Sequence, residues 1–239
     1  MKFNQNPAYT TSKSTTVDQG LRAYMLKVYN YMASALTLTG LVALLVSNNE
    51  QLMQTIHFSG IRWVVMFAPL AFLLFGWGAL MRRGSAAAVQ LGFFIFAAVM
   101  GVSMSSIFLV YTPYSITQTF LVTAIAFAGL SLYGYTTKKD LSGMGTFLIM
   151  GVIGLLVAMV INIFLQSPAM MFAISAIGIM IFAGLTAFYT QDIKNTYVAH
   201  AAHGDQEWLD KAAIDGALSL YISFLNMFQF LLMFMGQQE

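Results

Sequence analysis

The chain has 239 residues, of which 59% are hydrophobic and only 8% are charged. A soluble domain usually carries about 25% charged residues to cover its surface, so this composition excludes an ordinary soluble protein. The chain contains no cysteine, which excludes a disulfide framework, thiol chemistry and a cysteine metal site. The composition therefore predicts a protein embedded in the lipid bilayer.

Residues 1–20 are expected to form a flexible, polar cytoplasmic tail. The first seventeen residues, MKFNQNPAYTTSKSTTV, are rich in Ser, Thr and Asn and contain no apolar signal core. The hydrophobic segments all follow this tail. We expect residues 21–239 to form a single membrane domain.

Five stretches without charge indicate where the chain crosses the membrane. One membrane-spanning helix needs about 20 apolar residues. Three of the stretches are one span long, and the other two are long enough for two spans each. The stretches are residues 28–47, 63–81, 84–137, 141–191 and 216–238.

Each of the two long stretches contains a break at a proline. The breaks are YTPYS at 111–115 and QSP at 166–168, and proline resists continuation of a helix. The result is an all-α integral membrane protein with seven helices, since a barrel would show short alternating segments. The expected spans are about residues 28–47, 61–81, 86–110, 115–136, 144–166, 169–190 and 214–236.

The distribution of lysine and arginine predicts the orientation. Basic residues in short loops stay on the cytoplasmic side of a membrane. With seven spans, ten of the eleven basic residues share the side of the N-terminus, and only Arg62 lies opposite. We expect a multi-pass protein with a cytoplasmic N-terminus and an external C-terminus. The sixth span then ends near Asp192, and the seventh begins near Asp215, both on the cytoplasmic side.

Polar side chains form a stripe along the seventh span. At 100° per residue they fall within about 120° of one face. The stripe consists of Asp215, Ser219, Ser223, Asn226 and Gln229. Polar groups in a membrane most often hold helices together. A stripe that runs from the cytoplasmic end past the middle of the membrane also fits a lined cavity.

Asp192 and Asp215 allow two interpretations. Both lie near the cytoplasmic boundary, where headgroup water can solvate a carboxylate, and Lys211 has the helical ion-pair spacing to Asp215. Alternatively, the two carboxylates form a cytoplasmic gate. Brought together, they would titrate as a coupled pair near neutral pH and offer a weak calcium site.

The sequence gives little support to an enzyme. It contains no HExxH helix, phosphate-binding glycine loop or Gly-x-Ser-x-Gly turn. His57 is expected on the outer side, away from His200 and His203. The run HAAHGDQE, with Asp205 and Glu207, is more often solvated than metal-binding. We expect no enzymatic activity, no resident cofactor and no nucleic-acid partner.

Several segments resemble a known family. GLSLYGYTTKKDLSGMGTFLIMG (129–151), GVSMSSIFLVYTPYSITQTF (101–120), AGLTAFYTQDIK (183–194) and GALSLYISFLNMF (216–228) are similar to the Bax inhibitor-1 family in its bacterial branch. LRAYMLKVYNYMASALTLTG (21–40) is similar to the N-terminal part of that family. The resemblance implies six helices around a central seventh, a bacterial cytoplasmic (inner) membrane and a pH-sensitive calcium leak.

The same resemblance identifies two substituted positions. The family usually has Tyr-Asp-Thr-Gln at the end of the sixth helix and Leu-Tyr-Leu-Asp-Phe-Ile-Asn in the seventh. In this chain FYTQ places Tyr189 at the first aspartate, and LYISFLN places Ser223 at the second. The candidate gate and pore residues are Tyr189, Thr190, Gln191, Asp192, Asp215, Ser219, Ser223 and Asn226.

Two functions remain open at the level of sequence. The first is a passive leak of calcium or another cation, with the gate shifted to Asp192, three residues or about 4.5 Å from Tyr189, and to Asp215. The second is a non-conducting protein that modulates a membrane-bound AAA protease or a stress response, for which the polar tail supplies a flexible end. An intramembrane hydrolase is a third, weaker option, which no group of residues supports.

Overall fold

The computed structural model describes residues 7–201 and 205–236. Within these residues the chain is helical and contains no β-strand, and seven helices are long and apolar enough to cross a membrane. The prediction of an all-α, seven-span protein is confirmed. The elements are α1 (Pro7–Ser47), α2 (Glu50–His57), α3 (Ile61–Ala71), η1 (Phe72–Trp77), α4 (Gly78–Arg83), α5 (Ala86–Met104), η2 (Ser105–Leu109), α6 (Pro113–Thr136), α7 (Ser142–Leu165), α8 (Pro168–His200) and α9 (Gln206–Met235).

Both predicted breaks separate helices. At the first break, the Thr112 hydroxyl accepts a hydrogen bond from the Ser115 amide and caps α6, which begins at Pro113. At the second, Gln166 has a left-handed backbone with φ of 48° and ends α7. The Ser167 hydroxyl then caps α8. Proline in the first turn fits both starts, because an amide there has no helical partner.

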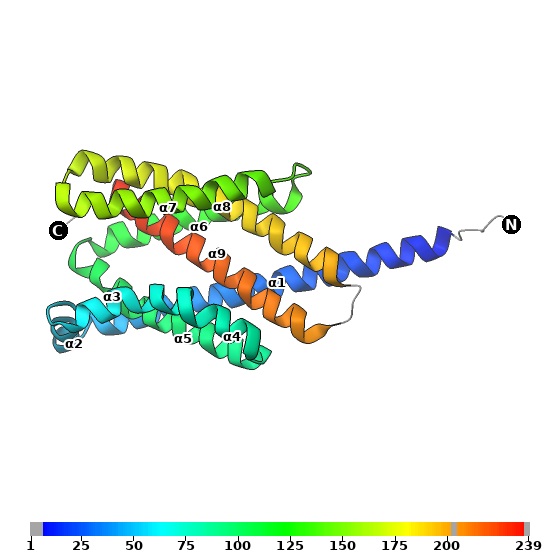
Figure 1. Cartoon of the computed structure of the whole chain (residues 1–239), viewed down its shortest axis with the longest axis horizontal. Coiled ribbons are helices and arrows are strands. Elements are labelled where there is room, and N and C mark those ends of the chain that lie inside the picture. Colours follow the sequence, from blue (N-terminus) through cyan, green and yellow to red (C-terminus); the bar gives the residue numbers. More distant parts are fainter. Residues whose placement is uncertain (1–6, 202–204, 237–239) are drawn as a thin grey trace.

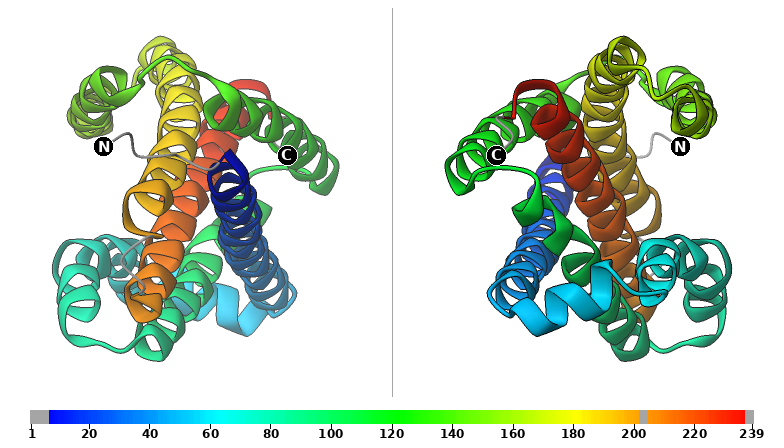
Figure 2. Two further views of the ribbon diagram at one scale, coloured as in Figure 1. Left: turned by 90° about the vertical axis from the view of Figure 1, so that its right-hand side faces the viewer. Right: turned by 90° about the vertical axis from the view of Figure 1, so that its left-hand side faces the viewer.

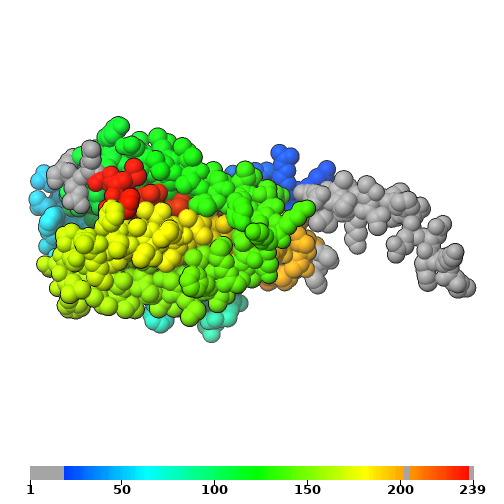
Figure 3. Space-filling model, turned by 90° about the horizontal axis from the view of Figure 1, so that it is seen from above, coloured from blue at the N-terminus to red at the C-terminus, as the bar shows by residue number. Residues whose placement is uncertain are grey.

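The seventh span, α9, occupies the centre of the bundle (Figures 1 and 2). It packs against α1, α5, α6 and α8. In its most apolar window 56% of the residues are buried, whereas the corresponding share is 11% in the second span. Figure 3 shows α7 and α8 spread over one face, with mainly the two ends of α9 in view. The predicted central position of the seventh helix is confirmed.

A buried tyrosine connects α9 to its neighbours. The Tyr221 hydroxyl lies 2.7 Å from the Thr39 hydroxyl, which itself donates to the Ala97 carbonyl of α5. Because Thr39 has used its only hydrogen, Tyr221 is the donor between the two. Phe93 and Phe96 of α5 meet the Tyr221 ring edge-on. This contact fixes α1, α5 and α9 at one level of the bundle.

Small residues bring two other helices into backbone contact. Gly134 of α6 is buried, and a Cβ atom at this position would collide with the carbonyl group of Ala187 in α8. The two helices therefore cross closely, as small residues allow in membrane proteins. Glycine is required here by the close approach of the neighbouring backbone.

The N-terminal segment differs from the prediction of a flexible tail over residues 1–20. Residues 1–6 lie outside the described residues, but the backbone of residues 7–20 is helical and continues into the first span. Between Pro7 and Gly20 the segment has neither glycine nor proline. Once the first span has formed, each added helical residue gains a hydrogen bond without a new nucleation step.

The helices on either side of the sixth loop are also longer than predicted. α8 continues to His200 and α9 begins at Gln206, whereas the expected spans end at 190 and begin at 214. The extensions are amphipathic and bury Ile193 and Leu209. Tyr197 packs on Tyr24 of α1 with 4.9 Å between the ring centres. Packing between helices thus stabilises segments that are too polar to count as membrane spans.

The second span is irregular and loosely attached. It contains Pro69 and then a π-helical turn, η1, and it packs mainly on α5. Such wide turns often occur at functional sites. Trp77, the last residue of η1, reaches α9 through a hydrogen bond to Asp215.

Candidate functional site

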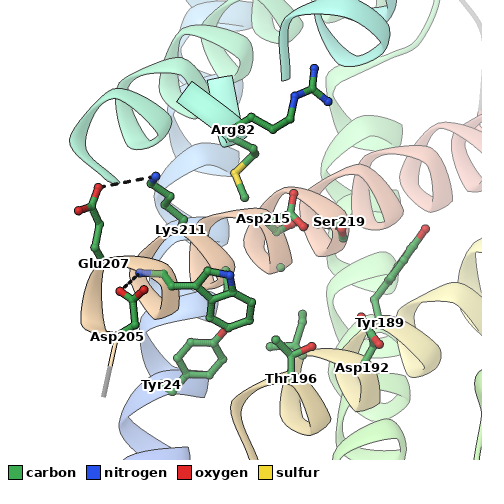
Figure 4. A pocket seen from close by; sticks show the side chains of 15 residues that line it. Tyr24, Arg82, Tyr189, Asp192, Thr196, Asp205, Glu207, Lys211, Asp215 and Ser219 are labelled. Carbon is green, nitrogen blue, oxygen red and sulfur yellow. Dashed lines mark hydrogen bonds and ion pairs between the residues drawn. The ribbon is translucent and has the colours of Figure 1, made fainter. Parts of the chain in front are cut away.

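A cavity of about 620 Å³ lies between α1, α4, α8 and α9 (Figure 4). We call it the carboxylate cavity. Its four carboxylates outnumber its two basic groups, which gives a formal charge of −2. The charged residues are Arg82, Asp192, Asp205, Glu207, Lys211 and Asp215.

Asp192 and Asp215 lie on opposite walls of the carboxylate cavity, on α8 and α9 (Figure 4). The Asp215 carboxylate accepts a hydrogen bond of 2.7 Å from the indole nitrogen of Trp77. The Asp192 side chain makes no hydrogen bond or ion pair with any residue that the structure describes. Both residues are exposed. The structure therefore brings the two aspartates to one cavity, while leaving them open to water.

The lysines expected beside these aspartates bind elsewhere. Lys211 has a helical spacing of four residues to both Glu207 and Asp215, and its Nζ lies 3.6 Å from Glu207. A glutamate that precedes a lysine by four residues is the better oriented partner. Lys194 donates to the carbonyl oxygen of Tyr135 at 2.8 Å. No lysine neutralises Asp192 or Asp215 within the described chain.

Hydrogen bonds along α9 leave its polar stripe with unused oxygen atoms. The Ser219 hydroxyl donates to the Asp215 carbonyl at 3.1 Å, and the Ser223 hydroxyl donates to the Ser219 carbonyl at 2.9 Å. The Asn226 amide donates to the Ile222 carbonyl at 2.8 Å. Each side-chain oxygen then retains lone pairs. We call Asp215, Ser219, Ser223 and Asn226 the acceptor ladder.

A second cavity, of about 870 Å³, lies further along the same face of α9. We call it the opposite cavity. Asn226 and Gln229 line it from α9. The carboxylate cavity reaches Ser219 and the opposite cavity begins at Ile222, a separation of about 4.5 Å along the helix. Ser223 lines neither cavity and is 1% exposed. Ser223 is therefore the one member of the acceptor ladder that is enclosed by protein, and we call it the closed step.

His57 lies in the wall of the opposite cavity, at the end of α2. Its Nε2 atom is 2.7 Å from the Ser105 hydroxyl, which donates its own hydrogen to the Val102 carbonyl. The imidazole is therefore the donor to Ser105. Burial lowers the pKa of His57, so the ring is uncharged at neutral pH and attaches α2 to η2.

Two of the predicted gate residues point away from both cavities. Thr190 lies 3.0 Å from the Ser131 hydroxyl of α6. Gln191 donates to the Lys139 carbonyl at 2.8 Å and accepts from the Leu141 amide at 2.8 Å. These residues hold α6 and the α6–α7 connection. Tyr189, by contrast, lines the carboxylate cavity.

Sequence reasoning missed Trp77 and Arg82 as members of the site. Arg82 could have been found from the sequence, because it is a charged residue at the end of a membrane span. Trp77 carries no such signal, because it is the last residue of the π-helical turn η1, which the sequence did not predict. Within the described residues, nothing supports a metal site in the run HAAHGDQE. His203 lies outside the described residues, and His200 stacks on Trp208 with 4.1 Å between ring centres.

Comparisons with known proteins identify relatives along almost the whole chain. A family model described as "Inhibitor of apoptosis-promoting Bax1" matches residues 21–239. The chain is 43% identical over 230 residues to an uncharacterized protein of Rickettsia prowazekii, covering 96% of each chain. It is 39% identical over 220 residues to inner membrane protein YbhL of Escherichia coli, covering 92% of this chain and 94% of that one. An uncharacterized Caulobacter vibrioides protein is 45% identical over 230 residues, with coverage of 92% and 91%.

Proposed function

The chain belongs to the Bax inhibitor family, and we propose that this multi-pass membrane protein is a weak, passive cation leak of a bacterial inner membrane. The location is supported by the relative named inner membrane protein YbhL. We place the N-terminus and the carboxylate cavity on the cytoplasmic side, because ten of the eleven basic residues fall there. The observation that carries the proposal is the acceptor ladder between two cavities.

The acceptor ladder suits a hard cation. Calcium binds oxygen atoms of carboxylates, carbonyls and hydroxyls, and the ladder presents carboxylate, hydroxyl and amide oxygens along one face of α9. The formal charge of −2 in the carboxylate cavity raises the local cation concentration. The path narrows at Ser223, where the buried hydroxyl leaves little room. A continuous ladder with one closed step supports a slow leak better than a fast channel.

The proposed gate uses the aspartates of this chain. Tyr189 and Ser223, which replace the family's carboxylates, carry no charge at neutral pH. Asp215 is therefore the one carboxylate within the acceptor ladder, and Asp192 lies across the carboxylate cavity from it. With only two carboxylates they hold calcium weakly, which suits an ion that passes through. In this proposal calcium is the ion that passes through the protein. The chain has no resident cofactor and no enzymatic activity.

Calcium flux tests the proposal directly. Purified protein in liposomes is expected to pass calcium in a manner that depends on pH between about pH 5 and 8. Because the carboxylates of Asp192 and Asp215 line the entrance on opposite walls, Asp192→Asn and Asp215→Asn should each shift the pH midpoint of flux. The matched control is Asp140→Asn, which alters an exposed carboxylate in the α6–α7 connection.

The outcomes separate the leak from its gate. Absence of flux at every pH would contradict the leak. Flux with an unchanged midpoint in both variants would remove the two aspartates from the gate. A midpoint that moves equally in Asp140→Asn would show a general effect of surface charge.

A second candidate is a non-conducting protein that modulates a membrane-bound protease. The supporting observation is α1, whose helix continues beyond the bundle in Figure 1. Such a projection is accessible to a partner. Deletion of residues 2–17 is expected to abolish co-purification with the protease while the thermal stability of the bundle is retained. Unchanged co-purification would contradict a role for this segment.

A further inference from the structure

A third hollow, of about 530 Å³, lies between α1 and α6. We call it the α1–α6 groove. Its walls are apolar and include Met25 and Leu26 of α1 and Phe127, Ala128 and Leu132 of α6. The groove exists because α1 and α6 both pack on α8 and α9 but make few contacts with each other.

The polar groups inside the groove are paired with each other. The Tyr29 hydroxyl lies 2.6 Å from the Ser131 hydroxyl, which lies 3.0 Å from the Thr190 hydroxyl. These bonds connect α1, α6 and α8 across the floor of the groove. Apart from these paired groups and from Arg22 and Tyr135 at one end, the rest of the lining is apolar, so it suits a hydrocarbon chain.

Basic groups lie at one end of the groove. Arg22 lines it and is exposed, and it has no ion pair within the described residues. Lys194 lies beside Tyr135, another lining residue, with its Nζ 5.2 Å from the ring centre. From Arg22 the groove runs along α1 to Tyr29, a length of about 10 Å. Its apolar part therefore begins at the membrane boundary and continues into the hydrocarbon.

We propose that the α1–α6 groove binds one anionic phospholipid, with an acyl chain between the helices and the phosphate on Arg22. A guanidinium group matches phosphate geometry with two parallel hydrogen bonds. Basic residues at a membrane surface attract anionic lipids. A zwitterionic lipid is bound less well, because its own ammonium group competes for the phosphate.

Native mass spectrometry of the purified full chain tests the proposal with two probes, phosphatidylglycerol and phosphatidylcholine with identical acyl chains. The wild-type protein is expected to retain phosphatidylglycerol preferentially. Arg22→Gln should reduce this preference about fivefold, the effect of one basic residue at a membrane surface. Ala128→Phe should fill the groove and reduce retention of both lipids.

Two matched controls distinguish the groove from the rest of the surface. Arg83→Gln removes an exposed arginine outside the groove, and Ala33→Phe adds a ring at an exposed position of α1 outside it. Neither control should change lipid retention. Equal losses in the controls, or unchanged retention in both Arg22→Gln and Ala128→Phe, would overturn the proposal. Equal retention of the two lipids by the wild-type protein would also overturn it.

Discussion

Replacement of Ser223 by leucine should abolish cation flux through the reconstituted protein. Ser223 is the only member of the acceptor ladder that is enclosed between the two cavities, where it is 1% exposed. Leucine removes the oxygen and adds volume at the closed step. Ser223→Ala removes the oxygen alone and should reduce flux roughly tenfold, as expected for the loss of one interaction with a charged group. The measurement is calcium entry into liposomes.

A control at the lipid-facing surface makes this result interpretable. Ser34 of α1 is exposed and lines neither cavity, so Ser34→Leu should conduct like the wild-type protein. Thermal unfolding in detergent checks that both leucine variants are folded. Wild-type flux in a folded Ser223→Leu protein would show that cations do not follow the acceptor ladder.

Alanine at Gly134 should destabilise the bundle by about 1–3 kcal/mol, the usual cost of excess volume in a packed interior. The added methyl group meets the carbonyl group of Ala187. Because this neighbour is backbone, α6 and α8 must separate along their crossing to relieve the contact. Thermal unfolding in detergent, followed by tryptophan fluorescence, measures the change.

The same helix provides the control for this substitution. A Cβ atom at Gly129 meets no atom within 4 Å. Gly129→Ala should leave the bundle intact and stabilise α6 by about 0.5–1 kcal/mol, because alanine loses less backbone entropy in a helix. Equal stabilities of Gly129→Ala and Gly134→Ala would contradict the close crossing of α6 and α8.

Membrane spans could be predicted because hydrocarbon imposes a length and a composition on them. The break at Pro113 and the turn at Gln166 depend on residues that are neighbours in the sequence, so they could also be predicted. The extensions of α8 and α9 beyond the spans depend on contacts between distant segments, such as Tyr197 on Tyr24. Hydropathy does not contain that information, so the sixth loop was predicted too long.

The candidate site was predictable to the extent that helical periodicity determines it. The polar stripe of α9 lies on one face, and topology brought Asp192 and Asp215 to the same end of the bundle. Periodicity alone does not choose between two equivalent partners, so the pairing of Lys211 with Glu207 was missed. Nor does periodicity reveal which face of α8 meets α9. Gln191 was therefore predicted as a gate residue because it adjoins Asp192 in the sequence, whereas its side chain binds the connection between α6 and α7.

The π-helical turn at Phe72–Trp77 also affects how this chain compares with its relatives. A π-helical turn accommodates one more residue than an α-helical turn. Loss of one residue within it would rotate every later side chain of the span by about 100°. Arg82 would then leave the carboxylate cavity and Trp77 would lose its hydrogen bond to Asp215, although the hydrophobic length of the span would hardly change. A homologue that is one residue shorter at this point would thus present different side chains to its seventh helix, even where the aligned sequences on both sides are identical.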